Sequence, residues 1–374
     1  MNLQLLNEVE EQADQQVLPD RYLGLSEEDL DVRIGAARAT LGERLLILGH
    51  HYQRDEVFKF ADDTGDSFKL AKVAAARREA DFIVLCGVHF MAESADVLSA
   101  EHQKVILPDL AAGCSMADMA ALDELEVCWD ELSEMGINDV VPVTYMNSAA
   151  SIKAFCGQHG GTVCTSSNAV ATFQWAWNRG ARILFLPDQH LGRNTAFGMG
   201  VPLQQMCVWD PNVTRGGLEP SELHAARMIL WKGHCSVHTK FTVEQVERLR
   251  ASHPDIRIIS HPECTLEVIQ ASDEVGSTSH IIRQVTESPV GSIWGVGTEI
   301  HLVNRLAQEV APERTVMTLD GLGCLCSTMY RVSPNHLCWV LEGLVNGEVR
   351  NQVSVSDDHK RWTRVALDRM LSIQ

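Results

Sequence analysis

The chain has 374 residues, of which 45% are hydrophobic and 22% are charged, so its composition is that of a globular protein rather than a disordered or fibrous one. It carries 31 Lys and Arg against 50 Asp and Glu, and the resulting formal net charge of −19 repels phosphate backbones and anionic membrane surfaces. We therefore expect no nucleic-acid partner and no membrane partner.

The first ten residues lack the basic and apolar regions of a secretory signal, and no later stretch reaches about 18 consecutive apolar residues. We expect a cytoplasmic protein with reduced thiols. The eleven cysteines are odd in number and spread from Cys86 to Cys338, which is not typical of a disulfide framework. Cysteines that gather in space would then be metal ligands or nucleophiles.

Residues 1–40 are expected to form an acidic helical lead-in, with a helix capped near Ser26. From Arg44 onward, short apolar and β-branched runs alternate with amphipathic stretches of helical length, a pattern that predicts a parallel α/β fold. Each run ends in a polar or glycine-containing segment. In chain order the runs are 45–48, 82–85, 105–107, 140–143, 162–163, 183–186, 256–260, 274–275 and 292–296.

These runs form three rounds of three, and each round is followed by a cysteine: Cys114, Cys235 and Cys326. The shared Leu-Pro-Asp at 107–109 and 186–188 favours a triplicated α/β unit, with one large doubly wound sheet as the alternative. Ligands of open parallel sheets bind beyond the carboxyl ends of the strands. The polar segments lie at those ends, so we expect the site there.

Two segments stand outside this pattern. The Pro/Gly-rich residues 199–222 are expected to form a loop or excursion before a helix over 221–230. The residues 356–371 are expected to form a charged amphipathic helix without chemistry of its own.

Several histidines lie at predicted strand ends or beside a candidate cysteine, and histidine is the natural proton carrier near neutral pH. His261-Pro262-Glu263 is the most informative segment, because it offers an imidazole and a carboxylate to one substrate. Short hydroxyl and amide side chains at other strand ends suit carboxylate or phosphate binding, although for each one taken alone a helix cap is the better explanation. The histidines are His50, His89, His238 and His261; the short polar residues are Ser67, Asn147, Ser166 and Thr278.

Dinucleotide, P-loop and nucleophile-elbow motifs are absent from the chain. No Cys-x-x-Cys pair marks a zinc site, so buried structural cysteines and a three-thiolate metal site both remain open. The residues alone predict an α/β enzyme with a polar centre for a small anionic substrate.

A series of short segments in fixed order, from about residue 45 to residue 340, resembles the quinolinate synthase family. The segments are 49–53, 61–62 with 65–67, 86–93, 107–109 with 112–118, 143–148, 165–170, 186–192, 231–238, 261–264, 275–279 and 297–299. The resemblance implies three similar parallel-sheet α/β domains in a pseudo-threefold arrangement around a central active site. The corresponding bounds are 1–40 for the lead-in, 41–138, 139–255 and 256–345 for the three domains, and 346–374 for a C-terminal helical tail.

The resemblance also implies a 4Fe-4S cluster bound by Cys114, Cys235 and Cys326. Cys326 is preferred to Cys324 because it begins the Cys-x-x-Met pattern of the family. An iron without a protein ligand would act as a Lewis acid. The implied reaction is that of a transferase in de novo NAD biosynthesis, which condenses iminoaspartate with dihydroxyacetone phosphate to quinolinate, phosphate and two waters. L-aspartate oxidase would supply the iminoaspartate.

By the same resemblance, nine residues would bind substrate: His50, Tyr52, Ser67, Tyr145, Asn147, Ser166, His261, Glu263 and Thr278. Tyr52 and Glu263, with His50 or His261, would move protons, while the short polar side chains would orient carboxylates or phosphate. Two alternatives stay open, an iron-sulfur hydro-lyase and an iron-sulfur redox sensor that binds a metabolite without turnover.

Overall fold

The structure, a computed structural model, describes residues 17–373, so most of the acidic lead-in before Pro19 lies outside the described residues. The chain divides into two compact units. One contains residues up to Cys114 together with Ser327–Val355, and the other contains Ser115–Cys326 together with the residues from Ser356 onward. The five-part division expected from the sequence remains a prediction.

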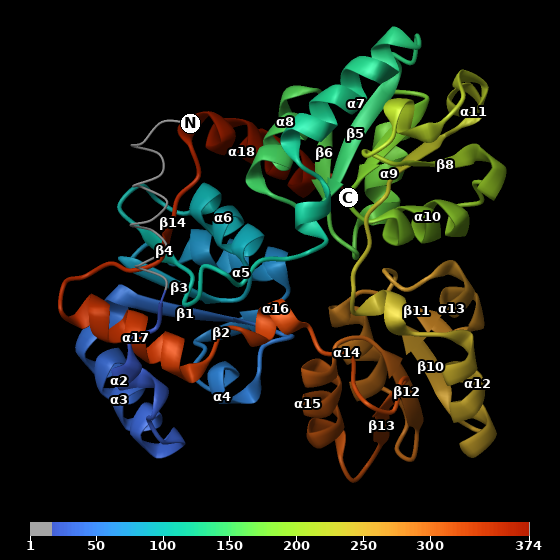
Figure 1. Ribbon diagram of the computed structural model, residues 1–374. Helices are drawn as coiled ribbons and strands as arrows, with labels where there is room; N and C mark the ends of the chain where they lie inside the picture. Colours follow the sequence, from blue (N-terminus) through green and yellow to red (C-terminus); the bar gives the residue numbers. More distant parts are fainter. Residues whose placement is uncertain (1–16, 374) are drawn as a thin grey trace. The chain divides into compact units, whose positions relative to one another are not determined.

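The first unit contains one five-stranded sheet with the strand order β14-β4-β3-β1-β2 (Figure 1). All pairs are parallel except that β14 runs antiparallel to β4. The strands are β1 (Leu45–His50), β2 (Asp63–Gly65), β3 (Phe82–Cys86), β4 (Lys104–Ile106) and β14 (Gln352–Val353). The helices are α2 (Asp20–Leu23), α3 (Glu27–Leu41), α4 (Asp55–Phe58), α5 (Ser67–Ala76), α6 (His89–Leu98), α16 (Ser327–Tyr330) and α17 (Pro334–Val345).

The second unit contains two fully parallel sheets, with the orders β6-β5-β7-β9-β8 and β11-β10-β12-β13. The strands of the first are β5 (Val140–Tyr145), β6 (Thr162–Cys164), β7 (Arg182–Leu186), β8 (Met206–Trp209) and β9 (Met228–Trp231); those of the second are β10 (Arg257–Ser260), β11 (Glu274–Val275), β12 (Ile293–Gly297) and β13 (Thr315–Thr318). The helices are α7 (Leu122–Glu134), α8 (Ala150–Gln158), α9 (Ala169–Trp177), α10 (Gln189–Gly198), α11 (Pro220–Ala225), α12 (Val243–Ser252), α13 (Leu266–Ala271), α14 (Thr278–Thr286), α15 (Ile300–Val310) and α18 (Asp357–Ser372).

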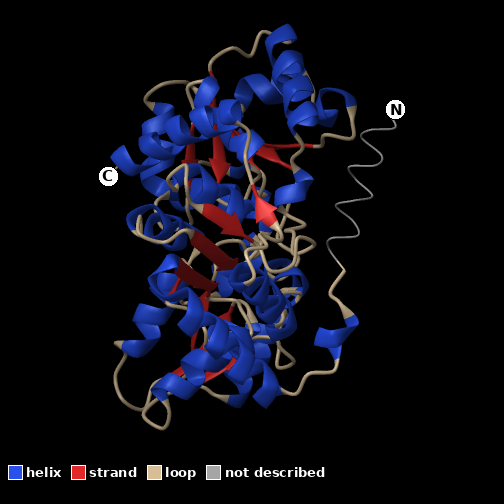
Figure 2. Ribbon diagram, turned by 90° about the vertical axis from the view of Figure 1, so that its left-hand side faces the viewer, coloured by secondary structure: helices blue, strands red, loops and turns tan. Residues whose placement is uncertain are grey.

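The three sheets repeat one topology. In each, the second strand of the round lies at an edge beside the first, and the third strand and the last strand of the round follow on the other side. When the additional strands β8 and β14 are left out, the order is 2-1-3-4 in all three sheets. In Figure 2 the strands lie inside and helices cover them, which explains why β1 is buried along its whole length. The expected α/β fold with three similar parallel sheets is confirmed.

Each round has more strands than the expected three: four in the first and third rounds, and five in the second because β8 is added. The short polar β2 gives no apolar signal, and the expected helix over 221–230 is wrong in its second half. Helix α11 ends at Ala225, and Met228–Trp231 forms the fully buried strand β9. A short, continuous apolar run does not distinguish a buried strand from a buried helix by periodicity, which is why the pattern misled.

The excursion over 199–222 also has a defined role. It contributes β8, which pairs in parallel with β9 and extends the 2-1-3-4 order by one edge strand. The sheet around β5 thereby gains a fifth strand.

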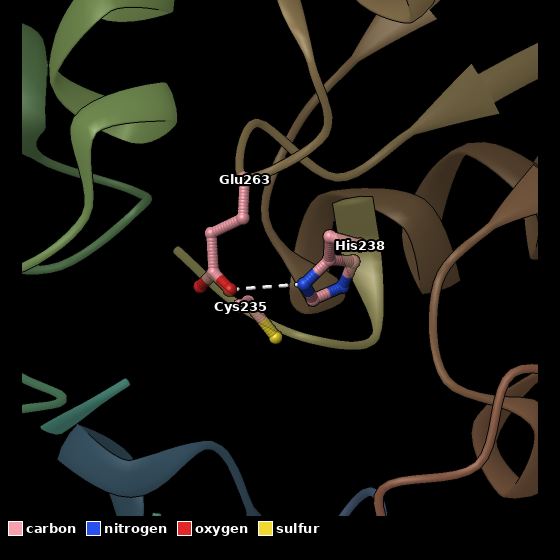
Figure 3. Close-up of side chains that lie close together, drawn as sticks. All are labelled: Cys235, His238 and Glu263. Carbon is pink, nitrogen blue, oxygen red and sulfur yellow. Dashed lines mark hydrogen bonds and ion pairs between the residues drawn. The ribbon is translucent and has the colours of Figure 1, made fainter. Parts of the chain in front are cut away.

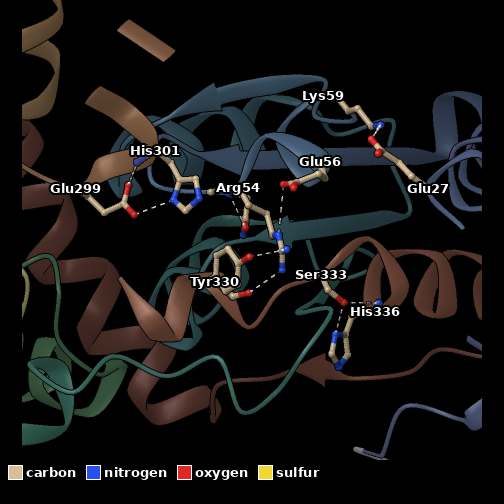
Figure 4. Close-up of polar contacts among 10 residues, drawn as sticks. Glu27, Arg54, Glu56, Lys59, Glu299, His301, Tyr330, Ser333 and His336 are labelled. Atoms are coloured by element: carbon tan, nitrogen blue, oxygen red, sulfur yellow. Dashed lines mark hydrogen bonds and ion pairs between the residues drawn. The ribbon is translucent and has the colours of Figure 1, made fainter. Parts of the chain in front are cut away.

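Each unit also contains a segment from the C-terminal part of the chain, Ser327–Val355 in the first unit and the residues from Ser356 onward in the second. In the first unit, Arg54 donates to the hydroxyl of Tyr330 at 2.9 Å and its guanidinium lies 3.8 Å from the centre of that ring (Figure 4). In the second unit, α18 packs against α8, and Thr363 donates to the carbonyl of Ala150 at 2.9 Å. No described helix is long and apolar enough to cross a membrane.

Candidate functional site

The described site residues follow the carboxyl ends of the strands, as expected for parallel sheets. In the first unit, His50 is the last residue of β1 and is 7% exposed. The rings of Tyr52 and His50 form a T-shaped pair, with an interplanar angle of 78° and 4.9 Å between their centroids. The register pairs His50 with Gly65, and Ser67 begins α5 two residues later. The sheet therefore brings His50, Tyr52 and Ser67 to one edge.

The second unit contains a buried polar cluster at the ends of several strands. Glu263 follows β10 and is 2% exposed, and His238 follows β9 and is 1% exposed. His238 Nδ1 lies 2.9 Å from Glu263 Oε2 (Figure 3), and His238 Nε2 lies 3.2 Å from the hydroxyl oxygen of Thr298. The imidazole is thus held at both nitrogens.

Two further side chains complete this cluster around Glu263. The His261 ring stacks on His238 with 4.5 Å between centroids, and its Nδ1 lies 3.7 Å from Glu263 Oε1. The hydroxyl of Tyr145, the last residue of β5, also forms a hydrogen bond with Glu263. A carboxylate is therefore surrounded by two imidazoles and a phenol.

The electrostatics separate the roles of these groups. Burial by itself would raise the pKa of Glu263, but His238, through its charge and its hydrogen bond, and the hydrogen bond from Tyr145 hold that pKa below its usual value. Burial lowers the pKa of His261 to about 3, so that imidazole stays neutral near pH 7. The fully buried Asp188 has the opposite tendency, because burial and the charge of Glu263 raise its pKa well above the usual range. An ionised carboxylate and a neutral acid therefore lie in one region, an arrangement suited to proton transfer.

The remaining predicted substrate residues lie at neighbouring strand ends of the second unit. Asn147 follows β5 and Ser166 follows β6, and both are half-buried. Thr278 is the first residue of α14, directly after β11, and is 6% exposed. Their substrate contacts remain predictions.

The cysteines differ in environment. Seven of the eleven are buried, whereas Cys114, Cys207, Cys235 and Cys326 are half-buried. Burial raises the pKa of Cys207 to about 12, which keeps its thiol protonated. The other three half-buried cysteines are those predicted as cluster ligands, and each follows the last parallel strand of its round, β4, β9 or β13. Cys235 and Cys326 pack against the same hydrophobic cluster of the second unit.

Cys324, the competing candidate, has a different environment. It is 4% exposed, and its Sγ lies 3.0 Å from Asp320 Oδ2. Burial and this carboxylate raise the pKa of Cys324 to about 12. Iron binds the thiolate, so the surroundings of Cys324 disfavour a ligand role.

A family model described as quinolinate synthetase A protein matches residues 33–372. The chain is 59% identical over 358 residues to a protein of Acidobacterium capsulatum named quinolinate synthase, with 95% of this chain and 96% of the relative covered. Proteins with the same name from Corynebacterium glutamicum and Halalkalibacterium halodurans are 54% and 52% identical, covering 96% and 95% of this chain and 91% and 96% of the relatives. This chain belongs to the quinolinate synthetase A family.

In this quinolinate synthetase A chain, three residues of the buried cluster were absent from the set predicted to bind substrate. In the sequence, His238 is one of several strand-end histidines, and Asp188 belongs to a repeated Leu-Pro-Asp. Thr298 had no assigned role. The sequence signal for His238 is its position three residues after Cys235, and the signal for Asp188 and Thr298 is their position at the end of a predicted strand. Their interactions with Glu263 and His238 join residues that follow different strands, so no local pattern in the sequence shows them.

Proposed function

We propose that this chain is a quinolinate synthase that condenses iminoaspartate with dihydroxyacetone phosphate to quinolinate, phosphate and two waters. The proposal is supported by the names of its relatives, which match it over nearly its whole length. The reaction balances without an oxidant, since the two substrates together contain the atoms of the three products.

The observation that carries the chemistry is the buried Glu263 with its hydrogen bonds to His238 and Tyr145. A carboxylate that is ionised in a buried site can accept a proton from a substrate carbon or nitrogen. His238 orients this carboxylate through the hydrogen bond at Nδ1, and its own ring is oriented by Thr298 at Nε2. Enolisation, imine formation and dehydration all require such proton transfers.

The donor chemistry also fits a 4Fe-4S cluster bound by Cys114, Cys235 and Cys326. Each is half-buried, so each combines partial shielding from solvent with access to a bound group. Three thiolates leave one iron without a protein ligand, and when bound such an iron supplies Lewis acidity toward a substrate carboxylate or hydroxyl.

The other site residues bind and orient the substrates. Ser67 and Thr278 begin α5 and α14, where backbone N–H groups of the first turn and a side-chain hydroxyl favour a carboxylate or phosphate. Asn147 and Ser166 add neutral donors. On the first unit, Tyr52 beside His50 offers a second acid for the leaving phosphate or hydroxyl.

The cellular context follows from this reaction. Quinolinate is a precursor in de novo NAD biosynthesis, and L-aspartate oxidase would supply iminoaspartate. Both substrates are small anions of the cytoplasm, where we place the protein.

The test is an anaerobic assay of the cluster-loaded protein with iminoaspartate and dihydroxyacetone phosphate. Quinolinate should appear, and Glu263→Gln should lower kcat by roughly 10²- to 10⁴-fold. Glu247→Gln, at an exposed position on α12, should leave kcat unchanged. Substrate binding without product would instead indicate a sensor, and full activity of Glu263→Gln would refute the proton-transfer role.

A further inference from the structure

Three donors of different chemistry meet within the second unit, as Figure 3 shows. Cys235 and His238 lie three residues apart after β9, and Glu263 comes from the segment after β10. One sulfur, one nitrogen and one oxygen atom from these residues all lie within 4.8 Å of one another. This set needs only the side chains of the second unit.

We propose that the cluster-free chain binds a single zinc-type divalent cation through Cys235, His238 and Glu263. Zinc accepts sulfur, imidazole nitrogen and carboxylate oxygen, and sites with three protein ligands keep a fourth position for water. Magnesium and calcium prefer oxygen ligands throughout, so a thiolate and an imidazole disfavour them. The thiolate and the carboxylate together balance the two charges of the cation.

The surroundings of the ligands suit such a site. Metal-binding imidazoles are usually oriented by a hydrogen bond at the second nitrogen, and His238 Nε2 has Thr298 at 3.2 Å for this purpose. Glu263 is likewise oriented by Tyr145. His238 and Glu263 are nearly inaccessible, while the half-buried Cys235 leaves the cation a route from solvent.

The proton balance of binding is simple. The cation takes the place of the proton between His238 Nδ1 and Glu263 Oε2; this proton moves to Nε2, so the imidazole stays neutral and donates to Thr298. The thiol of Cys235 loses its proton to solvent. Affinity for the cation should therefore fall as the pH is lowered, as it does wherever ligands must be deprotonated.

A consequence rests on the proposed function. If Cys235 is a cluster ligand, it cannot serve both metals, so a bound cation at this site would block cluster assembly. Zinc would then keep the protein inactive until it is removed, and the binding test below does not depend on the enzymatic activity.

The test uses full-length, cluster-free protein under anaerobic conditions with Co²⁺ as the probe. One Co²⁺ per chain should bind, with a thiolate-to-cobalt charge-transfer band and the visible absorption of tetrahedral geometry. His238→Ala and Glu263→Gln should abolish this spectrum, and Thr298→Val should weaken binding by roughly 10- to 100-fold. Cys326→Ala should bind Co²⁺ as the unaltered protein does.

Two results would overturn the proposal. Unaltered protein that binds no Co²⁺ would refute it directly. Loss of the spectrum in Cys326→Ala or Cys114→Ala, with retention in Glu263→Gln, would show that the predicted cluster thiolates hold the cation instead. Circular dichroism of each variant verifies folding. If His238→Ala does not fold, the isosteric variants Glu263→Gln and Thr298→Val still test the site, through loss of the cobalt spectrum and through weaker Co²⁺ binding.

Discussion

The thiol of Cys324 is already engaged by Asp320, whose other carboxylate oxygen accepts hydrogen bonds from Thr318 and from the backbone of Gly323, both at 2.8 Å. These hydrogen bonds orient Asp320, and the nearby carboxylate favours the protonated thiol of Cys324. Cys326, two residues later, is half-buried and has its backbone N–H 3.4 Å from Glu299. Cys324 and Cys326, two residues apart, thus differ in burial and in the groups around them.

We predict that Cys326→Ala, prepared without air, loses iron and sulfide, whereas Cys324→Ala retains both. The reason is that iron binds the thiolate, whereas burial and the carboxylate of Asp320 favour the protonated thiol of Cys324. Iron and sulfide analysis together with the visible spectrum measures the outcome. A Cys326→Ala protein with a full complement of iron, next to an iron-free Cys324→Ala, would reverse the assignment.

At the scale of elements, α10 holds the segment that carries His261 and Glu263. The side-chain amide of Asn194, on α10, donates to the carbonyl of Pro262 at 2.8 Å and to that of Cys264 at 2.7 Å. Asn194 is 8% exposed, so these hydrogen bonds are shielded from water. They connect the sheet around β5 to the segment after β10, whose His261 and Glu263 are proposed to act on the substrate.

We predict that Asn194→Ala lowers kcat by roughly 10- to 100-fold, because small displacements of a catalytic group have large effects on rate. Loss of two neutral hydrogen bonds should also lower stability by about 2 kcal/mol. Steady-state kinetics and thermal unfolding measure both effects. Asn304→Ala, at an exposed position on α15, is the control and should change neither. Wild-type kinetics in Asn194→Ala would exclude a positioning role.

Helix α18 approaches α8 so closely that a glycine is needed between them. A Cβ atom at Gly157 would lie 2.1 Å from the backbone oxygen of Trp362, a contact that requires the helices to separate. Arg369 further donates to the carbonyls of Gly157 and Gly161, at 2.9 and 2.7 Å. The C-terminal helix is therefore a structural part of the second unit.

We predict that Gly157→Ala destabilises the protein by about 1 to 3 kcal/mol, the usual range for overpacking. Gly35→Ala is the matched control: it also lies within a helix, α3, but a Cβ there meets nothing within 4 Å. It should be stabilising by roughly 0.5 to 1 kcal/mol, since alanine is the better helix former. Chemical unfolding of both variants measures the contrast, and equal stability of the two would contradict the close approach.

At the scale of the whole molecule, the late helix α17 is joined to the early helix α3 within the first unit. Glu342 accepts hydrogen bonds at 2.7 Å from the guanidinium of Arg33 through both carboxylate oxygens, and one from the hydroxyl of Tyr22 at 2.7 Å. The Arg33 hydrogen bond holds the pKa of Glu342 below its usual value of 4.5. This contact spans about 300 residues of sequence.

Because folding lowers the pKa of Glu342, its contribution to stability is complete above the unfolded-state pKa near 4.5 and is lost as the pH falls through the folded-state value. We predict that Glu342→Gln is less stable than the unaltered protein at pH 7 by about 1 to 2 kcal/mol. The difference should shrink steadily at pH values below 4.5. Unfolding midpoints across this pH range test it.

Glu101→Gln serves as the control for this prediction, because Glu101 is exposed in a turn of the same unit. It should not change the stability at any of these pH values. A pH-independent defect in Glu342→Gln would mean that packing, rather than charge, accounts for the effect.

The sequence by itself determined the parallel α/β class, the threefold recurrence and the strand ends that carry the site. These features have local causes: apolar runs such as Leu45–Leu48 and Ile183–Leu186 predict buried strands, and the polar segments that end them are readable in place. The cap at Ser26 is confirmed as well, since its hydroxyl accepts the N–H of Asp29 at 3.1 Å.

Only the tertiary structure decided how residues from different strands combine. The contact of His238 with Glu263, the hydrogen bonds of Asn194, the packing of α18 on α8 and the identity of β9 as a central strand involve partners far apart in the chain. Such contacts produce no local pattern in the sequence, because they depend on which strand ends lie close together once the sheets have folded. The protonation states of Glu263 and Cys324 follow from those contacts and from burial, so they too required the folded chain.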